Sequence, residues 1–375
     1  MRIALMGTRG IPANYGGFET FYENLAPRLV ERGHQVWVYN RPHAVGHREL
    51  KTYRGVHLVH LPSIATKHLD TITHTAFSVV HALRKRYDIV YICGVGNASL
   101  AWIPRLTTAS VVLNVDSSDW RRAKWGRVAA IYLRTMERLA GKAANLVIVD
   151  NQAIGLRYRS DHGIEAVFVP YGANVVRNES CQALQEWGLE AGKYLLWVGR
   201  LEPETRVEEL IEAFGRAALP GFKLAIVGDA PFADAYKKQL RAVASSDVVF
   251  TGRQFGEAYQ QLSCHAFAYV QTSPTSGTSP ALLDQMAFGN AVIARGTETN
   301  SEVVGSAGLT YSPEDPIDGL ASAMRSLHED DALVARLGLA AIERVRAEYS
   351  WEHITDVYTG LFGDLVKRKR RGKGI

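Results

Sequence analysis

The stretch that decides the fold is residues 2–39, "RIALMGTRGIPANYGGFETFYENLAPRLVERGHQVWVY". The short apolar run at residues 2–6 predicts a strand, and residues 35–39 predict another. Between them, residues 18–31 carry apolar side chains at helical spacing, and Gly33 follows as a natural C-terminal stop. A strand–helix–strand unit implies a right-handed crossover between parallel strands. The stretch therefore predicts an α/β protein.

The glycine-rich loop between the first strand and the first helix has three interpretations. A dinucleotide fingerprint needs G-x-G-x-x-G and an acid after the second strand. The glycines here have different spacing and no acid follows, although Arg41 offers a 2′-phosphate contact. An anion site at the helix start, built from Gly16 and Gly17 with Arg9 nearby, fits better, because free helical N–H groups attract anions. A plain turn is the third alternative.

Strand and helix patterns alternate in two series that are separated by a polar, turn-rich stretch near residues 170–190. We expect a first domain at 1–175, a second at 188–349, a helix at 351–366 that packs back on the first domain, and a basic tail at 367–375. The fold class is α/β, with two doubly wound Rossmann-like domains facing across a cleft. Ligands of such sheets bind beyond the carboxyl ends of the strands.

The expected elements follow the hydrophobic pattern. In the first series we expect strands at 2–6, 35–39, 56–61, 89–93, 111–115 and 146–149, and helices at 18–31 and 125–139. In the second we expect strands at 194–198, 223–227, 248–250, 266–270 and 291–294, and helices at 207–217, 233–243, 257–263, 281–288, 317–327 and 332–349.

Composition indicates a soluble globular chain. Of its 375 residues, 47% are hydrophobic and 22% are charged, enough for two cores and too apolar for a disordered protein. The net charge of +5 is concentrated in the tail "KRKRRGKG" at 367–374. Such a tail is either a solvated end or a source of attraction to anionic lipid, worth about 1 kcal/mol per basic residue. Nucleic acid is not expected, because no aromatic-basic platform accompanies the tail.

The three cysteines, Cys93, Cys181 and Cys264, are scattered and odd in number, which favours reduced thiols in a cytoplasmic protein. The sequence starts directly in a strand, so we expect no signal peptide. No apolar run approaches the roughly 20 residues of a membrane span, so any membrane contact is expected to be peripheral. Neither Asp-x-Asp at a strand end nor a His/Cys cluster occurs, so we expect no metal and no cofactor.

Two loops of the second series carry the expected donor site. In "VGRLEPETRVEELIEAF", residues 198–214, Arg200 follows a strand and Arg206 stands at a helix start. A cation at a helix N-terminus is unfavourable unless an anion binds there, so the pair favours phosphate binding over two surface arginines.

The second loop lies in "TSPTSGTSPALLDQMAFGNAVIA", residues 272–294. Gly277 and Thr278 offer backbone N–H groups and a hydroxyl, Ser279 is a good N-cap and Pro280 a good first helical residue. Asp284 follows one helical turn later. This combination suits a nucleoside diphosphate, with phosphate at the helix start and ribose hydroxyls on the carboxylate.

These residues resemble the nucleotide-sugar-dependent, retaining glycosyltransferases of family four, which have the GT-B fold. The resemblance runs along the whole chain. The stretches "GTRGIPANYGGFETFYENLAPRLVERGH" (7–34), "RGVHLVHLPSIATKHLDTITHT" (54–75) and "NVDSSDWRRAKWGR" (114–127) are similar to a bacterial subgroup that contains rhamnosyltransferases of cell-wall and capsular polysaccharide assembly.

The resemblance implies roles for the donor-site residues. Gly16 and Gly17 would lie by the donor phosphates, and Arg200 would contact the diphosphate. The family's partner lysine falls on Thr205, which leaves Arg206 as the nearest base.

Of the family's two glutamates, the first falls on Ser276 and is missing. The second falls on Asp284, one methylene shorter, which weakens or shifts the expected ribose contact. "FTGRQF", residues 250–255, makes Arg253 and Gln254 candidates for holding the base.

The expected catalytic residues are Arg200, which would stabilise the departing diphosphate together with the helix-start donors, and Asp116, which would contact the sugar. The expected acceptor residues are Asp119, Trp120 and Arg121, in an aromatic-basic patch suited to a lipid pyrophosphate. The alternative is that the aspartates only cap a turn and the tryptophan is packed.

The predicted function is transfer of rhamnose or another hexose from a nucleotide-sugar to a lipid-linked or saccharide acceptor, with retention and without a metal. We expect the protein in the cytoplasm, with peripheral contact to an anionic membrane surface at the inner face. Two alternatives stay open. One is a non-catalytic sugar-nucleotide-binding or assembly protein, suggested by the altered lysine and glutamate positions; the other is a nucleotide-sugar epimerase.

Overall fold

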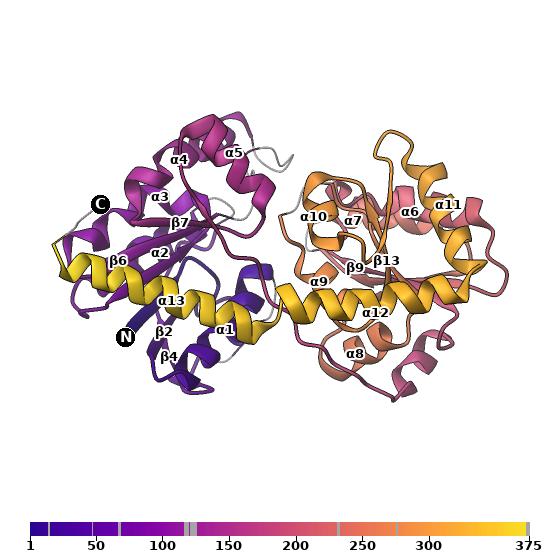
Figure 1. Ribbon diagram of the computed structural model, residues 1–375, viewed down its shortest axis with the longest axis horizontal. Helices are drawn as coiled ribbons and strands as arrows, with labels where there is room; N and C mark the ends of the chain where they lie inside the picture. Colours follow the sequence, from indigo (N-terminus) through magenta and orange to yellow (C-terminus); the bar gives the residue numbers. More distant parts are fainter. Residues whose placement is uncertain are drawn as a thin grey trace. The chain divides into compact units, whose positions relative to one another are not determined.

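The computed structural model describes residues 1–13, 16–46, 48–66, 69–115, 120, 126–230, 233–274 and 277–372. These residues form two compact units (Figure 1). Unit 1 contains Met1–Tyr171 and the C-terminal segment from Trp351, and unit 2 contains Gly172–Ser350. The stretch expected to link the domains belongs to unit 2, because Ala183 N donates to Gln261 Oε1 (2.7 Å) and His265 Nε2 lies 3.0 Å from Ser180 O.

The sheet of unit 1 has the strand order β3-β4-β2-β1-β5-β6-β7-β8. Its described strand pairs are parallel, apart from the antiparallel pair of β3 with β4. The bounds are β1 Arg2–Met6, β2 Gln35–Asn40, β3 Thr52–Tyr53, β4 Val56–His60, β5 Ile89–Cys93, β6 Ser110–Val115, β7 Leu146–Val149 and β8 Val167–Phe168.

The helices of unit 1 pack on both faces of this sheet. They are α1 Gly17–Glu31, α2 Asp70–Ala82, α3 Ala98–Ala101, α4 Arg127–Ala143, α5 Gln152–His162 and α13 Trp351–Arg370, with short 3₁₀ turns η1 Val95–Asn97 and η2 Ile103–Leu106. One core cluster joins α2, α3, α4 and α5 to strand residues such as Val90 and Ile92. Tyr91 points to the opposite face, where its ring contacts those of Phe21 in α1 and Tyr358 in α13.

Helix α13 is fastened to α1 by charge as well as by aromatic packing (Figure 1). Glu352 accepts from Arg28 Nε (3.3 Å) and Arg32 NH2 (2.9 Å). The helix continues to Arg370, so the prediction of a separate tail beginning at residue 367 was wrong. Lys369 Nζ donates to backbone carbonyls at the start of β6, and the negative helix C-terminus favours such basic residues.

The sheet of unit 2 has the order β11-β10-β9-β12-β13-β14, and its described neighbours are parallel. Numbered within the unit, this is the Rossmann order 3-2-1-4-5-6. The bounds are β9 Tyr194–Gly199, β10 Lys223–Gly228, β11 Val248–Gly252, β12 Ala268–Gln271, β13 Ala291–Arg295 and β14 Leu309–Tyr311. The predicted fold class, two Rossmann-like α/β domains, is confirmed.

The helices of unit 2 agree with the predicted ones to within one residue at each end. They are α6 Val207–Ala217, α7 Asp234–Val243, α8 Gly256–Cys264, α9 Pro280–Ala287, α11 Pro316–His328 and α12 Asp331–Glu348. The structure adds the 3₁₀ turns η4 Gln182–Trp187 and η5 Pro203–Thr205, and the helix α10 Glu298–Val304. The predictions had no helix for α10, a short element of seven residues.

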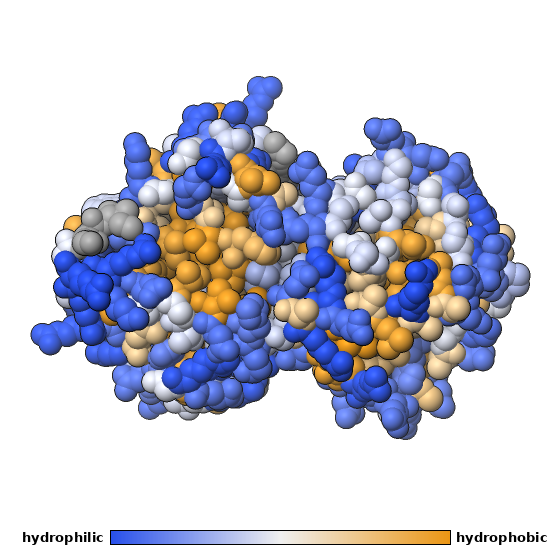
Figure 2. Space-filling model, in the orientation of Figure 1, coloured by the Kyte–Doolittle hydropathy of each residue, from blue (hydrophilic) through white to orange (hydrophobic). Residues whose placement is uncertain are grey.

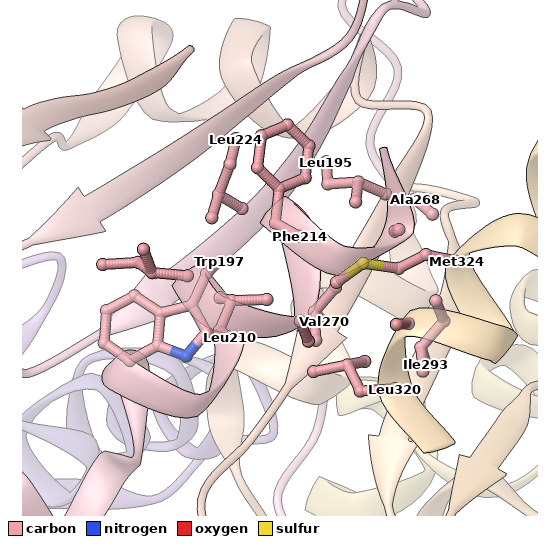
Figure 3. Close-up of a cluster of buried hydrophobic side chains, with 14 of the residues drawn as sticks. Leu195, Trp197, Leu210, Phe214, Leu224, Ala268, Val270, Ile293, Leu320 and Met324 are labelled. Atoms are coloured by element: carbon pink, nitrogen blue, oxygen red, sulfur yellow. The ribbon is translucent and has the colours of Figure 1, made fainter. Parts of the chain in front are cut away.

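The core of unit 2 is built from large apolar side chains of the sheet and of α6 and α11 (Figure 3). Leu195, Leu224 and Val270 meet Phe214 and Met324 there, all less than a tenth exposed. On the face visible in Figure 2, polar residues cover much of each unit and apolar residues gather over a part of it.

Replacing the buried aromatic ring between α1, β5 and α13 should destabilise unit 1. Phe21 is 1% exposed and its ring lies 5.2–6.1 Å from five other aromatic rings. We expect Phe21→Ala to lower the free energy of unfolding by about 3–5 kcal/mol, measured by urea denaturation. Phe77→Ala, at a 49% exposed position of the same unit, is the matched control and should change it little. Equal effects of the two variants would contradict the role given to this cluster.

Candidate functional site

The strand order of unit 2 reverses at β9, since β10 and β12 flank it on opposite sides. The chain leaves β9 toward α6 on one side of this point and leaves β12 toward α9 on the other. Open α/β sheets bind their ligands beyond the carboxyl ends of the strands at such a reversal. The loops 200–206 and 272–279 therefore hold the candidate donor site.

Gly199 and Gly228 let the ends of β9 and β10 approach each other closely, next to the point where the strand order reverses. Gly228 at the end of β10 has a φ of +144°, and a Cβ built on it would lie 1.8 Å from Gly199 O at the end of β9. A side chain is excluded by both the backbone conformation and the contact. The backbone itself therefore forms the floor of the site next to Arg200.

The loop after β9 is tied to the end of β12. Thr205 Oγ1 donates to Arg200 O (3.0 Å) and Glu202 O (2.7 Å), and Thr272 Oγ1 donates to Thr205 O (2.5 Å). Trp197 Nε1 donates to the same Thr272 hydroxyl at 3.0 Å. These bonds fix the backbone of Arg200, whose side chain is 37% exposed and whose guanidinium lies 3.5 Å from Glu202 Oε2. Thr205, at the place of the family's lysine, thus has a structural role in the loop.

Arg206 has acidic neighbours within its own helix. Its φ is +58°, and its guanidinium lies 3.9 Å from Glu208 Oε1 and 3.9 Å from Glu209 Oε1. Glu209 also binds Arg295, at 2.5 Å. The two glutamates in the first turn of α6 supply the negative charge that the helix start favours. Arg206 therefore does not require an anionic ligand, contrary to the expectation, and its donor role stays a prediction.

The start of α9 has the predicted capping. Ser279 Oγ accepts from Leu282 N (3.4 Å) and Pro280 is the first helical residue. Gly277 and Thr278 are buried just before it. Ser276, where the family has its first glutamate, lies outside the described residues.

Asp284 is half-buried on α9 and hydrogen-bonds the Tyr259 hydroxyl. Burial raises the pKa of the Asp284 carboxyl to about 7, and the bond from Tyr259 opposes this shift only in part. Burial also raises the pKa of Tyr259 well above its ordinary value, and the nearby Asp284 charge adds to it. Asp284 is therefore a carboxyl group that exchanges a proton near neutral pH.

The predicted base-binding residues follow β11. Gln254 Nε2 donates to Thr251 O (2.8 Å), which turns its amide back onto its own loop. Arg253 is exposed, and its charge helps to lower the pKa of Asp229, after the larger effect of the hydrogen bond from Lys237. The sequence reasoning missed Phe255, which is 64% exposed at this end of the sheet. An exposed aromatic ring directly after Arg253 and Gln254 was the available signal for a base-stacking candidate.

In unit 1, the loop after β1 is held by Asn40 at the end of β2. Asn40 Oδ1 accepts from Ile11 N (3.1 Å) and its Nδ2 donates to Ile11 O (2.7 Å). Gly10 has a φ of +112°, and a Cβ there would lie 2.1 Å from Asn40 Oδ1. Side-chain hydrogen bonds and a close backbone contact therefore fix the conformation of this loop at Gly10 and Ile11, which a plain turn would not need.

The helix start at Gly16 and Gly17 has a carboxylate of its own. Both glycines are exposed, and Gly16 has a φ of +104°. Glu19 in the first turn is 8% exposed, and its Oε1 accepts from Arg9 N (2.8 Å). Burial raises the pKa of Glu19, whereas the backbone bond and the Arg9 charge oppose this. A phosphate at Gly16 and Gly17 thus has Glu19 as a neighbour, and its binding there stays a prediction.

Arg41 does not offer the 2′-phosphate contact that the dinucleotide alternative needs. Its side chain is 4% exposed, and NH1 lies 2.9 Å from Asp70 Oδ2 while NH2 donates to Thr71 Oγ1 (3.1 Å). The guanidinium holds the start of α2 against the sheet.

Trp120 is the one predicted acceptor residue that the structure describes; Asp119 and Arg121, like the catalytic candidate Asp116, lie outside the described residues. Trp120 Nε1 donates to Glu137 Oε2 (3.1 Å). Glu137 is 1% exposed and also pairs with Arg157 at 3.1 Å. Trp120 is thus held by a buried carboxylate and packs against the core of unit 1, as the alternative of a packed tryptophan expects, and its acceptor role stays a prediction.

The described residues contain no group of three or more His, Cys, Asp or Glu side chains that could hold a metal ion. In the same part of the chain, no helix combines the length and the apolar character needed to cross a membrane.

Family models match both halves of the chain. Residues 192–330 match the model described as glycosyl transferases group 1. Residues 1–174 match a model described as a domain of unknown function, DUF1972.

Two of the curated relatives match over nearly the full length of the chain. The chain is 22% identical to O-antigen chain mannosyltransferase C of Escherichia coli, covering 98% of this chain and 100% of the relative. It is 26% identical to phosphatidyl-myo-inositol mannosyltransferase of Mycolicibacterium smegmatis, covering 94% and 92%.

Among solved structures, a sucrose-phosphate synthase from Thermosynechococcus elongatus superposes with a TM-score of 0.83 at 21% identity, covering 97% of this chain and 98% of that chain. Anabaena HepE in complex with UDP and glucose gives a TM-score of 0.80 at 19% identity, covering 97% and 100%. These likenesses show a common fold, GT-B.

The raised pKa of Asp284 should make stability depend on pH. In the unfolded chain this carboxyl has its ordinary pKa of 3.8, against about 7 in the folded one. As pH rises between these values, the unfolded state loses a proton that the folded state keeps, so stability falls. We expect Asp284→Asn to remove this loss, measured by denaturation at a series of pH values from about 4 to about 7.

Asp247→Asn, at an exposed position of the same unit, is the control and should leave the pH dependence of the wild type intact. A pH profile of Asp284→Asn that parallels the wild type would contradict the raised pKa.

Proposed function

Since this chain has the GT-B fold and its residues 192–330 match the model of the glycosyl transferases group 1, we propose that it is a hexosyltransferase of cell-surface polysaccharide assembly. It moves rhamnose or another hexose from a nucleotide-sugar to a lipid-linked or saccharide acceptor, with retention of configuration. The observation that carries the proposal is the strand reversal of unit 2, where the exposed guanidinium of Arg200 and the capped start of α9 follow adjacent strands.

The difficult charge in such a transfer is the one that develops on the departing nucleoside diphosphate. Donors that are already in place stabilise it without reorganisation. The Thr205 and Thr272 bonds hold the backbone of Arg200, and Ser279 fixes the start of α9. Arg200 then meets the developing charge from one loop and the helix dipole meets it from the other. Retention requires the acceptor to attack from the face that the diphosphate leaves.

The ribose contact is assigned to Asp284. As a carboxylate it accepts hydrogen bonds from hydroxyls; as an acid it donates one. Its pKa of about 7 means that ribose binding by this group depends on pH near neutrality. Arg253, Gln254 and the exposed ring of Phe255 are the candidates for the base. HepE was solved with UDP and glucose, which makes UDP the first nucleotide to test.

The acceptor is assigned to unit 1. Trp120, anchored by Glu137, is the described member of the acceptor segment. A lipid-linked acceptor is supported by the relative whose name gives phosphatidyl-myo-inositol as the molecule it mannosylates, and a saccharide acceptor by the O-antigen chain relative. We propose that the protein acts in the cytoplasm, at the inner membrane face.

A transfer assay tests the function directly. The full chain is incubated with a panel of nucleotide-sugars, UDP-sugars first, and with a polyprenyl-pyrophosphate-linked sugar or a free saccharide, and products are read by mass spectrometry. We expect a hexose added to one acceptor, retained anomeric configuration by NMR, and equal rates with and without EDTA. Donor binding without transfer to any acceptor would favour the non-catalytic alternative. An epimeric nucleotide-sugar formed without acceptor would favour the epimerase.

Arg200 is the sharpest single test of the donor site. We expect Arg200→Ala to weaken UDP binding by about 10- to 100-fold, because hydrogen bonds between charged groups are lost, with the fold intact. Calorimetry gives the affinity and circular dichroism the fold. Arg336→Ala, at an exposed position of α12, should bind UDP like the wild type. An unchanged affinity in Arg200→Ala would remove this arginine from the site.

A further inference from the structure

Three neighbouring elements of unit 1 expose an unusual number of large apolar side chains. We call this surface the α2–η2–α4 face. Its exposed members come from α2 and its ends, from η2 and its N-cap, and from α4: Leu69, Phe77, Val80, Leu83, Trp102, Leu106, Val128, Ile131, Tyr132 and Leu139. They are 38–83% exposed. In the described part of unit 2, by contrast, the exposed large apolar side chains are Val243, Phe255 and Leu339.

Helix α2 buries three polar side chains alongside Val79 and Ala82, and it exposes large apolar side chains. His74, Thr75 and Ser78 are fully buried against the sheet, whereas Phe77 and Val80 are 49% and 55% exposed. His74 Nε2 lies 3.1 Å from Asn40 O, and this hydrogen bond accounts for the burial of the imidazole. A surface helix of a water-soluble unit mostly exposes polar side chains, so folding alone does not account for the outer side.

The three elements form one continuous surface. α3, which leads into η2, packs between α2 and α4. Tyr132 of α4 donates to Gly96 O (2.8 Å), and Arg105 NH1 of η2 donates to Lys142 O at the end of α4. The exposed side chains of α2, η2 and α4 therefore lie on one face of the unit.

The charge of this face is positive. Its elements and the turn after α2 carry eight basic side chains: Arg84, Lys85, Arg86, Arg105, Arg127, Arg134, Arg138 and Lys142. The acidic residues of residues 69–88, 98–109 and 127–143 are three, and each is paired with an arginine from elsewhere: Asp70 with Arg41, Asp88 with Arg370, and Glu137 with Arg157.

The basic end of α13 is bound to the amino edge of the sheet. Lys369 Nζ donates to Thr107 O (2.9 Å) and Ala109 O (2.6 Å), directly before β6, and Arg370 lies 3.6 Å from Asp88, directly before β5. The turn at residues 84–86 lies in the same place, since it immediately precedes β5. The basic C-terminal residues therefore lie at the amino edge of the sheet, near the basic turn at residues 84–86.

We propose that the α2–η2–α4 face docks on a lipid bilayer that carries anionic headgroups. Apolar side chains combined with Lys and Arg, without exposed acids, are the pattern of surfaces that lie in a membrane interface. Long basic side chains reach the headgroups while their stems cover apolar groups, and a half-exposed tryptophan such as Trp102 favours the same depth. The inference rests on the proposed function, in that a lipid-linked acceptor is presented at a bilayer.

Co-sedimentation of the full chain with vesicles tests the docking. Vesicles of equal parts phosphatidylcholine and phosphatidylglycerol are compared with vesicles of phosphatidylcholine alone. We expect binding to the first kind, weaker binding at higher salt, and much less binding to the second.

Two variants separate the apolar from the basic contribution. The variant Phe77→Ser, Val80→Ser, Leu106→Ser should lower the partition coefficient on anionic vesicles roughly tenfold or more. The variant Arg84→Gln, Lys85→Gln, Arg86→Asn should lower it roughly 100-fold. Asparagine is used at position 86 because its φ is +46°, a conformation that asparagine tolerates.

The matched control lies in unit 2: Val243→Ser, Leu339→Ser, Lys238→Gln, at positions where Val243 and Leu339 are 61% and 62% exposed. It should bind anionic vesicles like the wild type. Binding of the two unit 1 variants equal to that of the control would overturn the proposal. A second result would also overturn it: the wild type does not bind vesicles but forms a dimer in sedimentation, and the variant with the apolar substitutions does not form this dimer.

The docking and the proposed function can be refuted separately. Transfer to a soluble saccharide, without vesicles, should be the same in the wild type and in both unit 1 variants. A chain that binds vesicles through this face but transfers no sugar would refute the function and leave the docking intact. A chain that transfers sugar but does not bind vesicles would refute the docking alone.

Discussion

The parallel pairing of β9 with both β10 and β12 is the constraint on which the candidate donor site depends. The chain crosses over from β9 to β10 in one direction and from β12 to β13 in the other. The loops that follow β9 and β12 therefore diverge from the same point at the carboxyl end of the sheet. Arg200 and the start of α9 come next to each other for this reason, although about 80 residues separate them in the sequence. The close contact with Gly199 O excludes a side chain at position 228, next to this site.

The altered positions of the donor site have physical roles in this chain. Thr205, in place of a lysine, ties the Arg200 loop to itself and, through Thr272, to β12. Asp284, in place of a glutamate, sits deep enough to hold its proton near neutral pH. The first change gives up a positive charge, so the described basic side chains of these two loops are Arg200, which lies near Glu202, and Arg206, which lies near Glu208 and Glu209.

In unit 1, several of the polar side chains near the predicted sites hold parts of the unit's own structure in place. Asn40 holds the loop after β1, Arg41 holds the start of α2, and Glu137 holds Trp120. Buried polar groups of this kind are stable only when they are hydrogen-bonded. Helix α2 buries Val79 and Ala82 together with polar side chains, while Phe77 and Val80 lie on the surface.

The sequence alone determined the two α/β series, most element bounds, and the loops 200–206 and 272–279, because hydrophobic periodicity and capping residues are local signals. It predicted neither the helical continuation to Arg370 nor the pairing of Arg206 with Glu208 and Glu209. Only the tertiary structure decided which polar side chains are buried and which apolar ones stay exposed. That choice depends on neighbours distant in the chain. Helix α2 was not among the expected helices, and its contacts with the sheet turn Phe77 and Val80 outward.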